Sequence, residues 1–290
     1  MKFFKRHSGR GSYDLFSNYN HYTPGIGGMF GLLGLFIAGG LLGNLVVLAM
    51  KTFLPEIASV YGTVISYPVI FIPAMLFASA KSRLDENFTP AVPVDSNRYG
   101  SLGGAAIAVI VSIATMAAAF ITDAASHFMP PKPPILEQIM KSLLDAPLWV
   151  TLISVSIFAP FFEEWLCRGM ILRGLLKNTN PTAAICISAA AFALIHLNPW
   201  QAIPAFTLGL LFGLVYYRTG SLKLTMLMHC VNNTMVALMS RIPAVEDADS
   251  FIEILPLLSY IGIFICSAAF LGASIVVLMN IPTTDKVDKN

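Results

Sequence analysis

Charge is scarce in this sequence. Charged residues make up 12% of the 290 residues, about half the fraction found in a typical soluble domain. Basic and acidic residues nearly cancel, and the net charge of +2 gives no indication of binding to nucleic acid. Hydrophobic residues make up 56%, and the mean hydropathy is +0.71. This composition predicts an integral membrane protein, with the lipid bilayer as its first partner and no nucleic-acid partner.

Cysteine is also rare, and the usual cysteine and zinc signatures are missing. The four cysteines, Cys167, Cys186, Cys230 and Cys266, all lie in apolar segments, where a cysteine is most often a small buried hydrophobe. They form neither a CxxC pair nor a disulfide framework. The sequence also lacks the HExxH motif of helical zinc sites. Zinc-ribbon and disulfide-stapled folds are therefore excluded.

Long apolar runs, by contrast, are abundant and set the fold class. Eight can be delimited, near residues 26–50, 61–80, 102–122, 147–170, 181–198, 200–217, 221–240 and 254–279. Most are long enough to cross about 30 Å of hydrocarbon at a helical rise of about 1.5 Å per residue. We therefore predict an all-α, polytopic transmembrane bundle of about eight helices. The fifth and sixth runs are the shortest and meet at "LNPWQ" without a polar loop.

The distribution of basic residues predicts the orientation of the bundle. With a cytoplasmic N-terminus, fourteen of the 18 lysines and arginines fall on the inner side, so both termini are expected in the cytoplasm. The expected location is a cell membrane, the inner membrane of a bacterium. The chain divides into a cytoplasmic segment (1–25), an N-terminal transmembrane region (26–146), a catalytic core (147–240) and a last helix with its tail (241–290). Nothing in the pattern selects an oligomeric state.

The stretch "IFAPFFEEWLCRGM" places ionisable side chains inside an apolar helix. At about 100° per residue, Glu164 and Arg168 lie on one face and can pair, whereas Glu163 points away from Arg168. The adjacent glutamates therefore have different roles, and Glu163 is the candidate general base. The alternative is a structural ion pair with a spare carboxylate. Cys167 shares a face with Glu163, so a Cys–His dyad stays open, although a buried thiol is a poor nucleophile.

Two further helices carry polar candidates. In "AAFALIHLNPW", His196 follows Phe192 by one helical turn, and a lone histidine in such a helix is more often a packing residue than a catalytic one. In "LTMLMHCVNNTMVAL", His229 and Asn233 share a face, while Asn232 points elsewhere and could link helices by hydrogen bonding. Together with Glu163, these groups supply a general base, a second proton handler and an oxyanion donor.

These residues resemble the CPBP family of intramembrane proteases, which includes the type II CAAX prenyl endopeptidases and bacteriocin-processing and self-immunity relatives. The matching motifs are EExxxR in "EEWLCR", FxxxH in "FALIH" and HxxxN in "HCVNN", in that order between about residues 148 and 240. The resemblance implies that Glu163 activates water, that His196 positions it, and that His229 and Asn233 stabilise the oxyanion. Glu164, Arg168 and Phe192 would support them, and the substrate would be a membrane-associated peptide or protein.

Metal dependence and the functional class both have alternatives. Glu163, His196 and His229 also form a His₂Glu set, a known catalytic zinc arrangement, so zinc is possible. We favour no cofactor, because an amide accompanies the set and the sequence shows no second-shell carboxylate for each histidine. A non-catalytic scaffold or self-immunity protein of the same fold is the main rival to a protease. A small-solute transporter is less favoured, because the polar residues cluster in one half of the chain.

The expected depths of Glu163 and His196 in the membrane do not agree. Glu163 lies near the cytoplasmic end of the fourth run, whereas His196 is about 22 Å into the fifth at the helical rise. The two can meet if the fifth helix begins shallower and is tilted, or if the fourth helix continues well past its apolar part, through "RGLLKN"; we favour the second. We expect this extension, with Arg173 and Lys177 marking the membrane interface.

Overall fold

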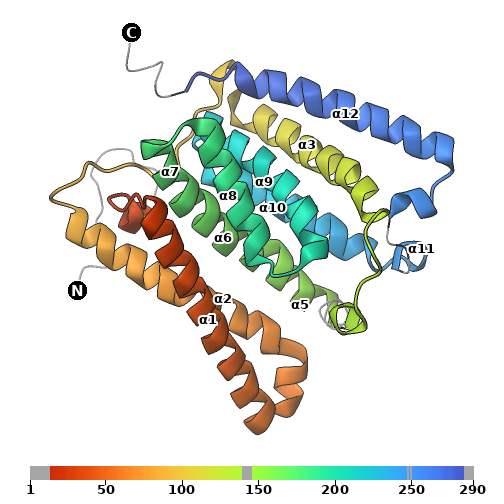
Figure 1. Ribbon diagram of the computed structural model, residues 1–290, viewed down its shortest axis with the longest axis horizontal. Coiled ribbons are helices and arrows are strands. Elements are labelled where there is room, and N and C mark those ends of the chain that lie inside the picture. The colour runs from red at the N-terminus through yellow and green to blue at the C-terminus, as the bar shows by residue number, and fades with distance from the viewer. Residues whose placement is uncertain (1–13, 139–145, 247, 249, 284–290) are drawn as a thin grey trace.

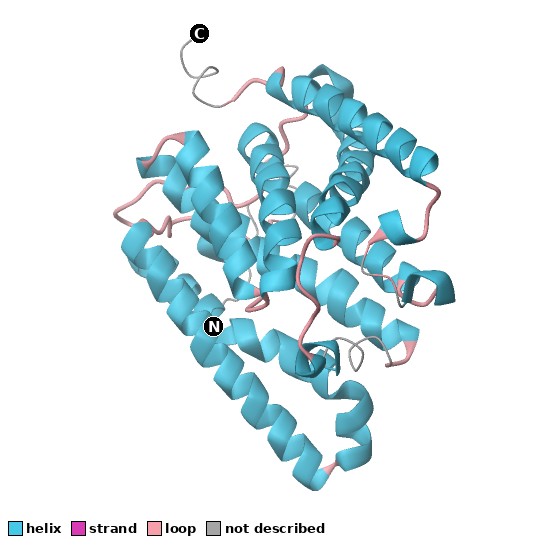
Figure 2. Ribbon diagram, turned by 45° about the vertical axis from the view of Figure 1, so that its right-hand side comes forward, coloured by secondary structure: helices cyan, strands magenta, loops and turns pink. Residues whose placement is uncertain are grey.

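The computed structural model describes residues 14–138, 146–246, 248 and 250–283. The long helices are α1 (Ile26–Phe53), α2 (Pro55–Asp85), α3 (Gly103–Ser126), α8 (Pro181–Ile195), α9 (Pro199–Thr219), α10 (Leu222–Met239) and α12 (Leu257–Met279). One further continuous helix consists of α5 (Leu148–Leu152), η3 (Ile153–Phe158), α6 (Ala159–Glu164), η4 (Trp165–Leu172) and α7 (Arg173–Asn178). Short helices are η1 (Ser17–Tyr19), η2 (Gly100–Leu102), α11 (Pro243–Glu246) and η5 (Phe251–Glu253). The described part of the chain contains no strand (Figure 2).

The predicted all-α transmembrane bundle is confirmed. Each of the eight apolar runs forms a helix, and six of these helices are long and apolar enough to cross a membrane. Helix α8 is shorter, with 15 residues, and α10 is not among the six spans found in the described residues. The orientation of the bundle in the membrane stays a prediction.

The helices form three layers (Figure 1). The central layer is built from α5–α7, α8, α9 and α10; the α1–α2 hairpin lies on one side of it and the α3–α12 pair on the other. The most apolar window of the 148–178 helix is 56% buried, against 11% for α12 and 17% for α1. The outer helices therefore present apolar surface outward, as a lipid-facing shell does, and the polar helix is the interior one.

Helix lengths explain how Glu163 and His196 come to the same depth. The 148–178 helix runs on through "RGLLKN" to Asn178, as predicted, and α8 begins three residues later. Glu163 lies as many residues before Asn178 as His196 lies after Pro181. Two antiparallel helices that leave a common turn by equal lengths end at the same level. The extension of the fourth helix therefore removes the depth mismatch.

The first residue of helix α10, Leu222, is fully buried, and the 86–99 segment covers this end of the helix. A Cβ added to Gly169 would lie 3.4 Å from Leu222, the first residue of α10, and 3.1 Å from Val94. Asp95 of the 86–99 segment caps this helix: its Oδ1 accepts a 2.8 Å hydrogen bond from the Leu222 amide, and its Oδ2 pairs with Lys223 at 2.7 Å. The segment thus seals the end of the bundle at which α10 begins.

Arg173 ties the same end together from inside. Its guanidinium donates to the backbone carbonyls of Val92, Tyr19 (2.9 Å) and Tyr22 (2.7 Å), and the residue is only 5% exposed. The side chain therefore faces the protein interior, and the expectation that Arg173 lies at the level of the membrane interface stays a prediction. A guanidinium offers five donors in a fixed fork, and here that fork joins residues 19–22 and the 86–99 segment to the central helix.

Candidate active site

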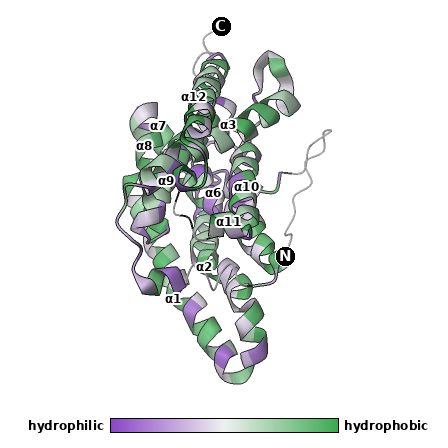
Figure 3. Ribbon diagram, turned by 90° about the vertical axis from the view of Figure 1, so that its right-hand side faces the viewer, coloured by the Kyte–Doolittle hydropathy of each residue, from purple (hydrophilic) through white to green (hydrophobic). Residues whose placement is uncertain are grey.

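The polar residues of the central layer gather where α6, α8 and α10 meet. Figure 3 shows hydrophilic colouring near α6 and α10, between apolar helices. Glu163 and Glu164 close α6 and are 9% and 0% exposed. Helix α6 lies between two π-helical segments, η3 and η4, and such segments widen the helix and free backbone acceptors at functional sites. The two adjacent carboxylates are therefore carried by locally irregular backbone.

One carboxylate oxygen of Glu164 binds both a buried guanidinium and an imidazole. Glu164 Oε1 accepts hydrogen bonds from Arg168 Nη1 at 2.7 Å and from His229 Nδ1 at 3.1 Å. Arg168 is fully buried, donates from Nη2 to the Gly209 carbonyl at 3.1 Å, and lies 4.4 Å from the ring centroid of Phe192. The structure thus brings Glu164 and Arg168 together as their spacing predicts, and gives Glu164 a further partner in His229.

Glu163 faces both histidines. Its Oε2 lies 4.0 Å from His196 Nε2 and 4.0 Å from His229 Nε2. His196 Nδ1 is 2.7 Å from the Phe192 carbonyl, which can only accept, so this nitrogen carries a proton. His229 Nδ1 stands in the same relation to the Glu164 carboxylate. In the neutral form each histidine therefore directs the lone pair of Nε2 toward Glu163.

Phe192 packs between these groups. Its ring makes edge-on contacts with both imidazoles, at centroid distances of 5.0 Å to His196 and 5.3 Å to His229. Its carbonyl orients His196 and its face lies against Arg168. The phenylalanine of the FxxxH motif thus spaces the two histidines and shields the buried cation.

Asn233 is held by neighbours other than Glu163. Its Nδ2 donates to the Val155 carbonyl in η3 at 2.7 Å, and its Oδ1 accepts from Asn232 Nδ2 at 3.0 Å. Asn232, expected to point elsewhere, is therefore part of the same chain of hydrogen bonds. One N–H of the Asn233 amide is left for another acceptor, which is the minimum an oxyanion donor requires.

Cys167 has the environment of a packing residue. It is fully buried, and its carbonyl accepts a 2.9 Å hydrogen bond from Ser188 of α8. Among the hydrogen bonds of the described residues, none joins its thiol to a histidine. The geometry thus gives no support to a Cys–His dyad.

Tyr67 of α2 is a site residue that the sequence analysis missed. Its hydroxyl donates to Glu163 Oε1, across 96 positions of the chain. A lone tyrosine in an apolar helix, far from the three motifs, carries no sequence signal. Because Tyr67 occupies Oε1, Glu163 directs Oε2 to the histidines, and this buried oxygen has no hydrogen-bond partner among the described residues.

The three candidate metal ligands have the right chemistry but wide spacing. Each histidine has an acceptor for Nδ1, as metal-bound histidines do. For His229 this acceptor is the Glu164 carboxylate, so the expectation that the histidines lack a carboxylate partner is wrong for His229. Around a tetrahedral zinc ion with bonds of about 2.0–2.1 Å, neighbouring ligand atoms lie about 3.4 Å apart. Here Glu163 Oε2 is 4.0 Å from each Nε2. Within the described residues, no group of three or more His, Cys, Asp or Glu is arranged to hold a metal ion.

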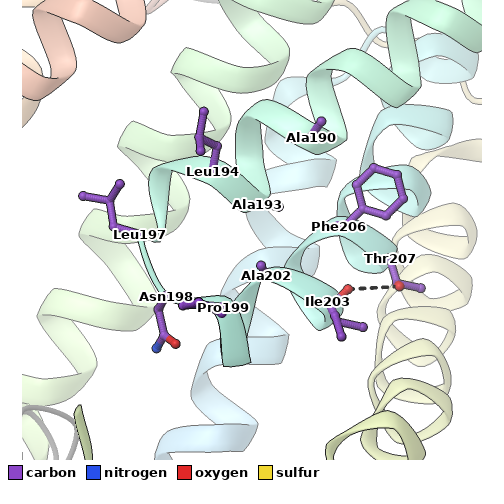
Figure 4. A pocket seen from close by; sticks show the side chains of 10 residues that line it. All are labelled: Ala190, Ala193, Leu194, Leu197, Asn198, Pro199, Ala202, Ile203, Phe206 and Thr207. Atoms are coloured by element: carbon purple, nitrogen blue, oxygen red, sulfur yellow. Dashed lines mark hydrogen bonds between the residues drawn. The ribbon is translucent and has the colours of Figure 1, made fainter. Parts of the chain in front are cut away.

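An apolar groove begins beside His196. It has a volume of about 640 Å³ and lies between α8 and α9 around their turn (Figure 4). Leu194 and Leu197 line one part and Ile203 and Phe206 another. Leu197, directly after His196, has a positive φ of 50°, an unusual conformation for a bulky residue. The groove and the candidate histidine therefore share one tight turn.

Comparison with known proteins agrees with this arrangement. Residues 145–235 match a family model described as "Type II CAAX prenyl endopeptidase Rce1-like". The match supports the resemblance of this core to the CPBP family. All three motifs lie within the matched residues, whereas Tyr67 lies outside them. The matched core is thus similar to membrane proteases, and the apolar helices point to a multi-pass membrane protein.

A relative named "Putative membrane peptidase YdiL", from Bacillus subtilis (strain 168), is 29% identical over 105 residues. The alignment covers 36% of this chain and 43% of that protein, so the chain matches less than half the length of its relative. No solved structure matches the chain significantly.

Proposed function

We propose that this protein is an intramembrane endopeptidase that hydrolyses a peptide bond of a membrane-associated peptide or protein with water activated by Glu163. The observation that carries the proposal is the position of Glu163 Oε2, buried, without a hydrogen-bond partner among the described residues, and 4.0 Å from the Nε2 atoms of two histidines. Groups separated by 4.0 Å can both bind one water at hydrogen-bond lengths of about 2.8 Å, at an angle near 90°.

In this mechanism Glu163 accepts a proton as water attacks the scissile carbonyl carbon. His196 accepts a hydrogen bond from the same water and orients it. Glu163 then returns the proton to the amide nitrogen as the carbon–nitrogen bond breaks, which leaves a carboxyl and an amine terminus. One carboxylate serves as base and then as acid.

His229 and the free N–H of Asn233 are the proposed oxyanion donors. With Nδ1–H on Glu164, His229 can donate from Nε2 only when doubly protonated, and the Glu164 carboxylate offsets that charge. Donors fixed before the reaction stabilise the tetrahedral intermediate without reorganisation. The Glu164–Arg168 pair would then contribute to catalysis, because Glu164 holds the His229 imidazole in place.

The apolar groove beside His196 is the proposed site for apolar parts of the substrate. Its walls come from α8 and α9, so a bound side chain would lie next to the turn that carries the histidine. We propose that the reaction needs no metal ion, which is supported by the 4.0 Å distance from Glu163 Oε2 to each histidine Nε2. We also propose that the protein resides in the cell membrane of a bacterium.

The experiment that tests the function compares membranes that carry the wild-type protein, Glu163→Gln or Glu56→Gln. Glu56 is exposed at the start of α2 and serves as the matched control. Mass spectrometry of membrane-associated peptides should show cleavage products with wild type and Glu56→Gln, and intact precursors with Glu163→Gln. A non-catalytic scaffold would change the amount of a partner without changing its termini. Products that persist at wild-type levels with Glu163→Gln would refute the proposal.

A further inference from the structure

Three groups proposed to act in the reaction, Glu163 and the two histidines, each have a partner that does not itself face the substrate. The Phe192 carbonyl orients His196, and Glu164 orients His229. Glu163 has the corresponding partner in Tyr67, whose hydroxyl donates to Oε1. We infer that Tyr67 is a positioning residue of the reaction, which fixes Oε2 of Glu163 as the working base. This inference rests on the proposed function.

The geometry separates the two oxygens of Glu163 into different roles. Oε1 is bonded to Tyr67, and Oε2 alone lies 4.0 Å from both histidine Nε2 atoms. A carboxylate that is free to rotate would exchange its oxygens and spread over several rotamers. A hydrogen bond to a charged group resists that rotation. Tyr67 thus holds the lone pair of Oε2 toward the place where water is deprotonated.

The ring of Tyr67 is itself held by an aromatic cluster. Tyr67 packs against Phe71 at 5.8 Å, and Phe71 stacks on Phe162 at 5.2 Å with an interplanar angle of 17°. Phe162 is the residue before Glu163, so the cluster ties α2 directly to α6. Phe71 is 1% exposed, and a buried aromatic pair of this kind keeps its partners in register.

Helix α1 and the prolines of α2 fix the turn that carries Tyr67. The carbonyl oxygen of Ile70 would lie 1.9 Å from a Cβ added to Gly39, so α1 lies directly against this turn. Pro68 and Pro73 lie inside α2, where each removes a backbone hydrogen bond and bends the helix. Figure 1 shows α2 bent part-way along its length. The α1–α2 hairpin therefore has a function beyond spanning the membrane.

The test uses Tyr67→Phe, which removes the hydroxyl and keeps the ring. Tyr61→Phe is the control, because Tyr61 lies on the same helix against Trp149, away from Glu163. Purified proteins in detergent micelles would be assayed with a library of internally quenched peptides that carry an apolar anchor. We expect kcat to fall about 10- to 100-fold in Tyr67→Phe, by analogy with the loss of a group that orients a metal ligand. KM should stay unchanged, and Tyr61→Phe should behave as wild type.

A double variant and a spectroscopic measurement complete the test. If Tyr67 acts only through Glu163, then Tyr67→Phe with Glu163→Gln should be no slower than Glu163→Gln alone. The infrared carboxylate band that disappears in Glu163→Gln should shift in Tyr67→Phe but not in Tyr61→Phe, and this readout needs no substrate. Wild-type activity of Glu163→Gln would defeat the proposed function. An inactive Glu163→Gln with wild-type kcat, or an unshifted band, in Tyr67→Phe would overturn the role of Tyr67 alone.

Discussion

Arg168 Nη1 lies 2.7 Å from Glu164 Oε1, and neither side chain is exposed. A fully buried pair of this kind costs much to break, because removal of one partner leaves an uncompensated charge away from water. The pair also holds His229 through the same carboxylate oxygen. Stability and the arrangement of the candidate site therefore depend on one ion pair.

Replacement of Arg168 should destabilise the protein strongly. We expect Arg168→Ala to cost about 3–5 kcal/mol of unfolding free energy. Lys81→Ala is the control: Lys81 pairs with Asp85 at 3.1 Å with the same i,i+4 spacing, but its side chain is 44% exposed. An exposed helical pair of this kind contributes about 0.3–0.5 kcal/mol. Thermal unfolding in detergent measures both, and equal melting temperatures for the two variants would contradict the buried pairing.

Two neighbouring glycines of α1 should respond in opposite directions. A Cβ at Gly39 would lie 1.9 Å from the backbone oxygen of Ile70, whereas a Cβ at Gly40 would meet nothing within 4 Å. Gly39→Ala should therefore force α1 and α2 apart and lower the melting temperature. Gly40→Ala should leave it unchanged or raise it, because alanine favours a helix by up to about 1 kcal/mol. Similar unfolding curves for both variants would show that the close approach of α1 and α2 is not needed.

Asn233 should matter for both rate and stability. Asn233→Ala removes the proposed oxyanion donor, and kcat should fall about 10²–10³-fold. It also breaks the 2.7 Å bond to the Val155 carbonyl, so the melting temperature should drop slightly. Asn232→Ala removes only the donor to Asn233 and should slow the reaction much less. Comparable rates for the two variants in the peptide-library assay would argue against an oxyanion role for Asn233.

Metal chelation should leave the enzyme active. Dialysis against a zinc chelator is expected to change kcat by less than about twofold, because in the proposed mechanism Glu163 and His196 activate the water without a metal. Elemental analysis of the purified protein provides a readout independent of activity and should find no stoichiometric zinc. Loss of activity that returns on addition of zinc, with one zinc per chain, would instead make Glu163, His196 and His229 its ligands.

The orientation in the membrane can be tested with single cysteines in a cysteine-free background, since native Cys186 and Cys266 are exposed. Arg83 and Glu137 are both exposed, at opposite ends of the predicted topology. A membrane-impermeant thiol reagent added to intact cells should label position 137 and leave position 83 unlabelled until the cells are opened. The reverse labelling pattern would show that the bundle has the opposite orientation in the membrane.

The sequence by itself determined the helices and part of the site. Apolar runs cannot leave their backbone groups unpaired in lipid, so each had to become a helix. The spacing of Glu164 and Arg168 placed them on one face, and the three motifs named the residues that the bundle brings together. These features depend on local geometry, which a sequence shows directly.

Only the tertiary structure decided how those residues are joined. His196 reaches Glu163 because two helices of matched length share a turn, and His229 reaches Glu164 because α10 packs against α6. Tyr67 contacts Glu163 from a helix with no motif of its own, and Asn233 is bonded to a carbonyl in a π-helical segment. Such contacts depend on the packing of helices far apart in the chain, and neither periodicity nor spacing within one helix can predict them.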